Sequence, residues 1–226
     1  MSVFTISDLH LSLSSDKPMD IFRGWEDYVE KLKNNWLANI KDEDYVIIPG
    51  DISWALKLTD TKKDLEFINN LPGKKIILKG NHDLWWESMK KMGEFFENEG
   101  FDSIKILHNN AFEVENIAVA GSRGWFFDDT ADRKIVLREV GRLEASINAA
   151  KAFGKEIIVF LHYPPVTTEN ICNEIFDVLK KHNIKRCYYG HIHKAGSHKI
   201  MSGEIDGITL KCVSCDILGF IPYKVS

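Results

Sequence analysis

The sequence predicts an α/β protein, and three observations support this fold class. Short runs of β-branched and other apolar residues recur along the chain, each of the length of one buried strand. Between them lie longer stretches whose apolar residues repeat at helical spacing. Several of the short runs end directly in Asp, Asn or His. Such positions are typical of the carboxyl edge of an open α/β sheet, where ligands bind.

Five predicted strands have polar residues at their ends. The clearest strand ends at Pro49-Gly50, because neither residue favours continuing a strand, and Asp51 follows at once. If the five strands are parallel, their ends meet at one edge, and the polar residues there form a metal-ligand set. The strands and their polar ends are 3–7 with Asp8 and His10, 45–49 with Asp51, 75–79 with Asn81, 157–161 with His162, and 186–189 with His191 and His193.

Helices are expected where apolar residues form one stripe. The stripes predict helices over 25–40, 61–71, 84–99, 132–153 and 171–182. In the third of these, Met89, Met92, Phe95 and Phe96 are expected to face inward. The short runs 104–107, 111–114 and 117–120 indicate a meander with some antiparallel strands, and further short strands continue to Val213.

The bulk composition fits one domain over residues 1–226. The chain has 226 residues, of which 44% are hydrophobic, enough for a sizeable core. Its formal net charge of −4 argues against a general binder of nucleic acid or of membrane surfaces, which would usually be basic. Phosphate substrates remain compatible with this charge, because a bound metal would supply local positive charge.

The compartment expected from the sequence is the cytoplasm. The first residues lack the basic and apolar segments of a secretory signal, and no stretch approaches the ~18 apolar residues of a spanning helix. The four cysteines are therefore expected to be thiols. Cys212 and Cys215 have the spacing of half a zinc site or of a redox pair, but buried thiols are the favoured interpretation because no second pair exists.

The strand-end residues suit a divalent transition metal. Carboxylate and imidazole ligands favour Mn, Fe, Co and Zn over Ca or Mg. Asp51 has two carboxylate oxygens and could bridge two ions ~3.5–4 Å apart, the separation used in two-metal phosphoryl chemistry. His191 and His193 are two residues apart, so on a strand they would share a face and reach the same cluster.

The ordered set of motifs resembles the signature of the calcineurin-like metallophosphoesterase superfamily. The resemblance is carried by Asp8-x-His10, Gly50-Asp51, Gly80-Asn81-His82-Asp83, His162 and Gly190-His191-x-His193. Within that superfamily, the chain is similar to uncharacterised prokaryotic phosphohydrolases. The resemblance implies a four-layer α/β/β/α sandwich, in which two facing mixed β-sheets are flanked by helices and the metal site lies at the C-terminal ends of the strands.

The resemblance also implies a ligand set for two divalent transition-metal ions. Manganese is the first choice, and Fe, Zn, Co or Ni are the alternatives. A hydroxide that bridges the ions would attack phosphorus in line. The first ion would be held by Asp8, His10 and His193, the second by Asn81, His162 and His191, and Asp51 would be shared by both.

His82 is expected to bind no metal. By the same resemblance it would face the scissile phosphate, where it would donate to a phosphoryl oxygen or protonate the leaving oxygen. His82 and Asp51 are therefore the catalytic candidates, and Asn81 and His82 are also candidates for binding substrate. Asp83 is a candidate for orienting the ring of His82.

Several further residues have open roles. Arg123 could clamp a phosphate of the substrate or pair with a structural carboxylate such as Asp128. The loop 11–22 could line the substrate site or be an ordinary connection. Four tryptophans near the predicted strand ends could stack on a base, line an apolar pocket or pack in the core; they are Trp54, Trp85, Trp86 and Trp125. Three histidines outside the pattern are expected at the surface, namely His108, His182 and His198.

The predicted function is metal-dependent hydrolysis of a phosphate mono- or diester, with a small molecule or nucleotide-like compound as substrate. Protein serine/threonine phosphatases are disfavoured, because the Asp-Arg-Gly that they carry after the Gly-Asp motif is replaced here by Ile52-Ser53-Trp54. One alternative is a metal-dependent nuclease, against which the net charge counts. The other is a non-catalytic scaffold, which would lack ligands that this chain retains. No membrane or nucleic-acid partner is expected, and the sequence indicates no oligomeric state.

Overall fold

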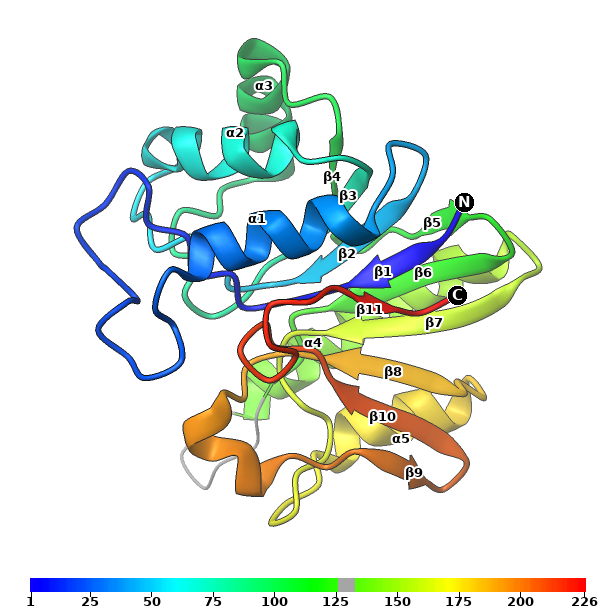
Figure 1. Cartoon of the computed structure of the whole chain (residues 1–226). Coiled ribbons are helices and arrows are strands. Elements are labelled where there is room, and N and C mark those ends of the chain that lie inside the picture. The colour runs from blue at the N-terminus through cyan, green and yellow to red at the C-terminus, as the bar shows by residue number, and fades with distance from the viewer. Residues whose placement is uncertain (126–132) are drawn as a thin grey trace.

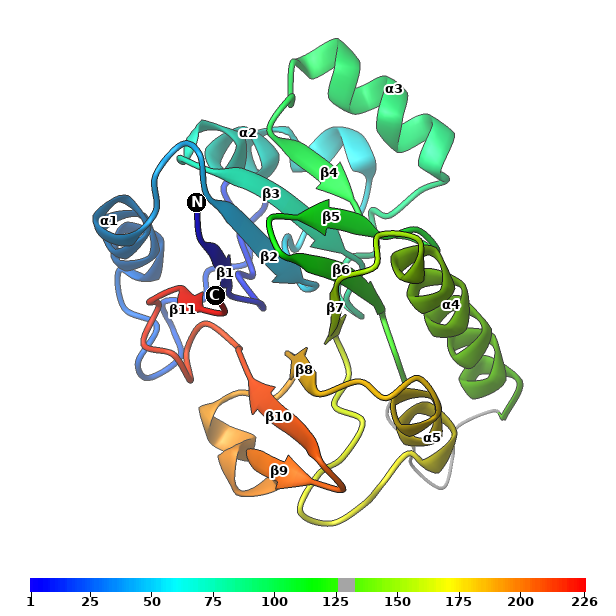
Figure 2. The ribbon, with the colours of Figure 1, turned by 90° about the vertical axis from the view of Figure 1, so that its right-hand side faces the viewer.

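Two β-sheets lie face to face, with helices on their outer faces (Figure 1). The computed structural model describes residues 1–125 and 133–226. Helices α1 (Tyr28–Asn39) and α2 (Lys62–Asn70) lie on one side of the paired sheets, and α4 (Arg133–Lys151) and α5 (Asn173–Lys181) lie on the other (Figure 2). The α/β class and the sandwich of four layers predicted from the sequence are thereby confirmed.

The first sheet has five strands in the order β11-β1-β2-β3-β4. Strands β1 to β4 run parallel, and β11 pairs antiparallel with β1 at the edge. Beside α1 and α2, its outer face carries α3 (Met89–Glu99) and the short 3-10 helix η1 (Leu58–Thr61). The strands are β1 (Val3–Thr5), β2 (Tyr45–Pro49), β3 (Lys74–Leu78), β4 (Ile104–Ile106) and β11 (Tyr223–Lys224).

The second sheet has six strands in the order β5-β6-β7-β8-β10-β9. Its four inner strands run parallel, and the edge strands β5 and β9 are antiparallel to their neighbours. A short 3-10 helix, η2 (Lys194–Lys199), precedes β9. The strands are β5 (Phe112–Val114), β6 (Ile117–Ser122), β7 (Glu156–Leu161), β8 (Arg186–Tyr189), β9 (Gly203–Ile205) and β10 (Ile208–Cys212).

Three apolar cores join the four layers. Leu32 and Trp36 of α1 pack with residues of the first sheet, and Leu143 and Ile147 of α4 pack with residues of the second. The third core lies between the sheets and includes Ile47 of β2 and Phe160 of β7. Because β2, β3, β7 and β8 are buried on both faces, the uninterrupted apolar runs read from the sequence are explained by this double burial.

The region predicted as a meander is divided between the two sheets. Ile104–Ile106 forms β4, which runs parallel to β3 in the first sheet. Phe112–Val114 and Ile117–Ser122 form an antiparallel pair in the second sheet, as expected. The predicted grouping of all three runs was therefore wrong, because hydrophobic pattern identifies strands but not the sheet to which each belongs.

Two predicted helix starts were wrong, and local capping explains one of them. The helix expected from residue 84 begins at Met89, where Ser88 in the N-cap position accepts a hydrogen bond from the backbone N–H of Lys91 at 3.4 Å. Met89 is 38% exposed rather than inward-facing. The helix expected from residue 25 begins at Tyr28.

The four cysteines are free thiols with buried side chains. The Cys215 thiol donates to the backbone carbonyl of Asp8 at 2.9 Å, and the Cys212 thiol donates to the carbonyl of Ile192 at 3.6 Å. These contacts agree with the interpretation of Cys212 and Cys215 as buried structural thiols. Among the described residues, no helix has both the length and the apolar character that crossing a bilayer requires.

Candidate metal centre

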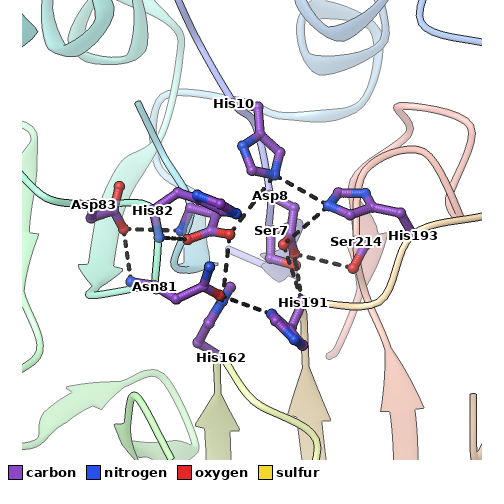
Figure 3. Close-up of polar contacts among 12 residues, drawn as sticks. Ser7, Asp8, His10, Asn81, His82, Asp83, His162, His191, His193 and Ser214 are labelled. Carbon is purple, nitrogen blue, oxygen red and sulfur yellow. Dashed lines mark hydrogen bonds and ion pairs between the residues drawn. The ribbon is translucent and has the colours of Figure 1, made fainter. Parts of the chain in front are cut away.

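The polar ends of five parallel strands meet at one edge of the sandwich. Figure 3 shows the side chains that follow β1, β3, β7 and β8 pointing toward one another in a single cluster. Asp51, which follows β2, contacts two of them, as described below. The residues brought together are Asp8, His10, Asp51, Asn81, His162, His191 and His193. The structure thus assembles every residue that the sequence marked as a metal-ligand candidate.

Several of these residues adopt a backbone conformation that L-residues with side chains avoid. Asp8, His10, Asp51 and His191 have φ values of 58°, 46°, 51° and 71°. Such residues persist only where the surrounding structure holds them, and they cluster at functional sites. His191 and His193 lie beyond the end of β8, so they do not share a strand face as predicted. Both reach the cluster because the chain turns sharply at His191.

A first group of possible metal ligands combines Asp8, His10 and His193. Their ligand atoms all lie within 4.8 Å of one another. The Nε2 atoms of His10 and His193 are 3.2 Å apart, and His193 Nε2 lies 3.8 Å from Asp8 Oδ1. These two imidazole nitrogens face each other, so their lone pairs could both be directed at one cation bound beside them.

A second group combines Asp51, His162 and His191, again with ligand atoms within 4.8 Å of one another. The side-chain oxygen of Asn81 belongs to it, since it lies 2.7 Å from His162 Nε2 and 2.8 Å from His191 Nδ1. His162 Nδ1 lies 3.0 Å from the backbone carbonyl of Pro49. A proton on Nδ1 would be donated to that carbonyl, which leaves the Nε2 lone pair directed into the cluster.

Asp51 faces both groups. Its Oδ2 atom lies 3.8 Å from His10 Nε2 and 3.5 Å from His162 Nε2. Its other oxygen, Oδ1, accepts a hydrogen bond from the backbone N–H of His82 at 2.8 Å. One carboxylate therefore stands between two ligand groups, the geometry that a bridging ligand needs.

Burial keeps most of the imidazoles neutral. It lowers the pKa of His162 to about 3 and that of His191 to about 4, where the charge of His193 adds to the effect. For His193, burial acts to lower the pKa, but the hydrogen bond with Asp216 and the charge of Asp8 raise it overall. Burial and the charges of Asp8 and Asp83 raise the pKa of Asp51 to about 9. Neutral imidazoles beside crowded carboxylates form a donor set that a divalent cation fits.

Asp83 supports the backbone of Asp51 and does not orient the ring of His82 as suggested from the sequence. Its carboxylate accepts the backbone N–H groups of Asp51, Ile52 and Gly80 at 2.9, 2.9 and 2.7 Å. It also accepts a weaker bond from the N–H of Ser53 and one from the indole N–H of Trp85 at 3.1 Å. A single buried carboxylate thus ties the loop after β2 to the loop after β3.

Asp8 is held by groups that sequence reasoning did not identify. Its carboxylate accepts from the Ser7 hydroxyl, from the Ser214 hydroxyl at 3.1 Å and from the backbone N–H of His191 at 3.0 Å. The bridge between Ser7 and Ser214 brings the end of β1 beside the end of β10. Neither serine lies in a recognisable motif, so the contact depends on pairing across the sandwich.

The glycines of the motifs have a steric role. A Cβ atom at Gly80 would overlap the carboxylate and backbone nitrogen of Asp51. A Cβ at Gly190 would overlap the carboxylate of Asp8 and the hydroxyl of Ser7. Glycine at these two positions is therefore a condition for packing the strand ends closely enough to share a cluster.

Asp216 is the functional candidate that sequence reasoning missed. Its carboxylate accepts from His193 Nδ1 at 3.0 Å and from the backbone N–H of Lys194 at 2.8 Å. The contact fixes the His193 ring so that Nε2 faces His10. A sequence signal was present, since Asp216 follows an apolar segment that contains β10, as Asp51 follows β2.

We expect Asp216→Asn to weaken metal binding by about 10- to 100-fold, because carboxylates that orient a ligating histidine typically contribute that much. Metal-free protein, prepared with a chelator, is titrated with Mn²⁺ in a calorimeter to measure the affinity. Asp177→Asn on the exposed face of α5 is a matched control. Unchanged metal affinity in Asp216→Asn would show that the Asp216–His193 contact has no role in holding a metal.

A cavity of about 670 Å³, here called the aromatic cavity, lies beside His10 and His193 of the cluster. Trp54 stacks on the His10 ring with centroids 4.9 Å apart and lies 4.4 Å from the His82 ring, and Trp25 contacts both His10 and His193. Met19 and Phe22 also line this cavity, so the loop 11–22 borders it and is not a remote connection. The other lining residues include Arg23, Gly24, Lys194, Ala195 and Asp216.

The other three tryptophans considered in the sequence analysis lie outside the aromatic cavity. Trp85 is 1% exposed and belongs to the core, where it supports Asp83. Trp125 packs against Tyr163 and under the guanidinium of Arg123. Trp86 borders a second cavity, considered below. Trp25, which the sequence placed only in a helical stripe, is therefore a site residue that pattern reasoning missed.

Arg123 lies 3.6 Å from Glu139 of α4, which is almost fully buried. Asp128, the partner suggested from the sequence, lies outside the described residues. The backbone carbonyl of Arg123 accepts the N–H groups of His162 and Tyr163, so Arg123 also positions the end of β7. Of the three other histidines, His198 is exposed, whereas His182 contacts Glu144 at 3.2 Å with a mostly buried side chain and His108 borders the second cavity.

Comparison with known proteins points to one family. The profile described as calcineurin-like phosphoesterase matches residues 1–195, a range that contains every residue of the two ligand groups. Two relatives are named probable cyclic nucleotide phosphodiesterase. The one from Vesicomyosocius okutanii subsp. Calyptogena okutanii is 23% identical over 172 residues, or 72% of this chain and 67% of that protein. The one from Ruthia magnifica subsp. Calyptogena magnifica is 21% identical over 191 residues, or 80% of this chain and 72% of that protein.

Solved structures share the fold. The phosphopantetheinyl hydrolase from Mycobacterium tuberculosis aligns with a TM-score of 0.54 at 14% identity, covering 99% of this chain and 95% of that one. A protein from Thermus thermophilus aligns with a TM-score of 0.52 at 15% identity, covering 87% of this chain and 85% of that one. At these identities the likeness extends to architecture alone.

Proposed function

The chain belongs to the calcineurin-like phosphoesterase family, and from this premise we propose that it hydrolyses a small phosphodiester with two divalent metal ions. Family membership makes it a metal-dependent phosphohydrolase. The observation that carries the dinuclear proposal is the position of Asp51, whose Oδ2 lies within 3.8 Å of His10 and 3.5 Å of His162. A carboxylate in this position can be shared by two ions.

Each ion has a set of proposed ligands. Asp8, His10 and His193 would hold the first, and Asn81, His162 and His191 the second, with Asp51 common to both. Manganese is the proposed metal, with Fe, Zn, Co or Ni as alternatives, because imidazole and carboxylate donors suit this group of ions. When bound, such ions activate water at neutral pH and stabilise negative charge on phosphoryl oxygens.

His82 is the proposed hydrogen-bond donor to the substrate. Its ring borders the aromatic cavity and lies 5.5 Å from the His10 ring, centroid to centroid. Burial lowers the pKa of His82, so the neutral imidazole with a single ring N–H dominates at neutral pH. That N–H can donate a hydrogen bond to a phosphoryl oxygen, or to the leaving oxygen as negative charge develops on it, without transferring its proton. The backbone of His82 is fixed separately through its N–H bond to Asp51.

The aromatic cavity supports a substrate with a planar ring. A volume of about 670 Å³ is that of a small-molecule site, and too small for an extended polymer. Trp54, which is half-buried, lines the cavity with an aromatic ring that a base can contact, and Arg23 and Lys194 add positive charge at the border. The names of the two relatives agree with a nucleotide-like diester. We further propose that the protein works in the cytoplasm, in keeping with its free thiols.

Metal removal and replacement test this function. After chelation we expect no turnover of bis(p-nitrophenyl) phosphate, p-nitrophenyl phosphate or a cyclic nucleotide. Addition of Mn, Fe, Co, Zn or Ni separately should restore turnover, best with Mn and better for the diester than for the monoester. Metal analysis of the restored protein should give two ions per chain.

Three results would contradict the proposal. Turnover that survives chelation would exclude the metal-dependent mechanism, and full activity with one ion per chain would exclude the dinuclear one. Hydrolysis of DNA or RNA in preference to all three small substrates would favour the nuclease alternative.

A further inference from the structure

A second cavity, of about 410 Å³, shares none of its lining residues with the aromatic one. Its wall includes Lys79, which precedes Gly80-Asn81, and Arg123, whose carbonyl accepts the N–H of His162. The cavity therefore adjoins the backbone next to Asn81 and His162 without being lined by either residue. The aromatic cavity, by contrast, is bordered by His10 and His193.

The second cavity is lined by more positive than negative side chains. Four cationic residues line it, against the carboxylates of Glu87 and Glu139. Lys79 and Arg138 form no hydrogen bond or ion pair with any residue in the described ranges, and the charges of Asp83 and Glu139 act on Lys79 only from a distance. The cations are Lys79, Arg123, Arg138 and Arg142.

Two of the guanidinium groups, those of Arg123 and Arg142, are held in place before any ligand arrives. Glu139, with a side chain only 1% exposed, lies 2.6 Å from Arg142 Nη1 and 3.6 Å from Arg123 Nη2. The indole of Trp125 supports the other side of Arg123, with the guanidinium carbon 4.8 Å from the ring centroid. Arg138 and Arg142 are four residues apart on α4, so they share one face of the helix.

The positive charge around this cavity affects a neighbouring histidine side chain. His108 borders it, and burial together with the charges of Arg142 and Lys79 lowers the pKa of this histidine. The Arg123 Nε atom is buried and has no hydrogen-bond partner among the described residues. Preorganised guanidinium groups with spare donors are the usual receptor for a phosphate, whose oxygens accept bidentate bonds.

We propose that this basic cavity binds a phosphate-type oxyanion separate from the metal centre. Arg142 and Arg138 would supply its main donors from α4, and Lys79 and Arg123 would supply positive charge from the strand ends. The anion could be a second phosphoryl group of the substrate or a free anion. The first source rests on the proposed function, because the substrate would then extend from the metal centre into the cavity.

Binding of inorganic phosphate to the metal-loaded, full-length protein tests the site. Equilibrium dialysis should give two phosphates per wild-type chain, one at the metal centre and one in the cavity. Arg142→Gln and Arg138→Gln should each raise the dissociation constant of the second phosphate by about tenfold or more, the usual effect of losing a charge-assisted bond. Lys151→Gln, an exposed charge change on the same helix, is the matched control.

The variants separate this proposal from the proposed function. Asp51→Asn should lose the phosphate at the metal centre and retain the one in the cavity. Since Arg142 pairs with buried Glu139, its loss could disturb folding, and Arg138→Gln avoids this difficulty because Arg138 has no described partner. A single phosphate per wild-type chain, or a second phosphate unaffected by Arg138→Gln, would overturn the cavity site.

Competition experiments then identify the source of the anion. Adenosine 3′,5′-bisphosphate and adenosine 5′-monophosphate are compared as inhibitors of diester hydrolysis. If the substrate supplies the anion, the bisphosphate should inhibit more strongly, and Arg138→Gln should remove its advantage. If the anion is free, the two inhibitors should be equal. Added phosphate should then inhibit both proteins through the metal centre, and an additional change in turnover should appear in the wild type alone. No difference in either measurement would contradict a functional cavity.

Discussion

Replacing Asp51 with Asn is expected to lower kcat/KM for the diester by at least ~10³-fold. Asn keeps the volume of the side chain and its tolerance of left-handed backbone, here φ 51°. It loses the negative charge that faces His10 at 3.8 Å and His162 at 3.5 Å. Metal content should fall along with activity, because the same carboxylate is proposed as a ligand to both ions. Steady-state kinetics and metal analysis measure the two effects.

Asp206→Asn is the matched control for this change. Asp206 is exposed, lies between β9 and β10 and also has a positive φ of 49°. It should retain wild-type kinetics and metal content. If Asp51→Asn kept two ions per chain and near-normal turnover, the bridging role assigned to Asp51 would be wrong.

His82→Ala is expected to lower kcat by about 10²- to 10⁴-fold while leaving metal content unchanged. The ring of His82 belongs to neither ligand group, and only its backbone N–H contacts Asp51. Alanine preserves that N–H, so the position of Asp51 should not change. The loss should therefore appear in the chemical step, and it should be smaller for substrates whose leaving oxygen is less basic and gains less from a hydrogen bond.

Two measurements separate this role from a structural one. A series of aryl diesters with leaving groups of increasing pKa should show a steeper dependence of rate on leaving-group pKa in His82→Ala than in the wild type. His198→Ala, which removes an exposed histidine near the site, should show no change. Loss of metal in His82→Ala would mean that His82 serves the metal centre directly.

The clustering of the candidate metal ligands could be predicted from the sequence, because each of them follows an apolar run. Strands such as β2 and β7 are buried on both faces, so their hydrophobic pattern is uninterrupted and their ends are well marked. Because these strands are parallel, their carboxyl ends lie at the same edge, and the residues that follow them meet there. The geometry of His191 and His193 was nevertheless wrong in detail, since they follow β8 in a turn rather than lying on it.

Residues that act through other residues were harder to predict. Asp83 was recognised but given the wrong partner, because its bonds to the backbone of Asp51 and Ile52 join segments that are distant in sequence. Asp216 was missed, because its role depends on contact with His193 across the end of the sheet. An apolar stripe also gives no sign of Glu139, which lies on the buried face of α4, where its pairing with Arg123 and Arg142 offsets the cost of burying a charge.

The carboxylate of Asp83 has a consequence for motion at the site. It accepts hydrogen bonds from backbone N–H groups of the segments after β2 and β3. These bonds join Asp51 and the turn Gly80-Asn81-His82 into one rigid unit. These residues should consequently keep their relative positions throughout a catalytic cycle. Entry and release of ligands would then depend on movement of the loop 11–22, whose Met19 and Phe22 also line the cavity, and the rate of that movement would limit product release.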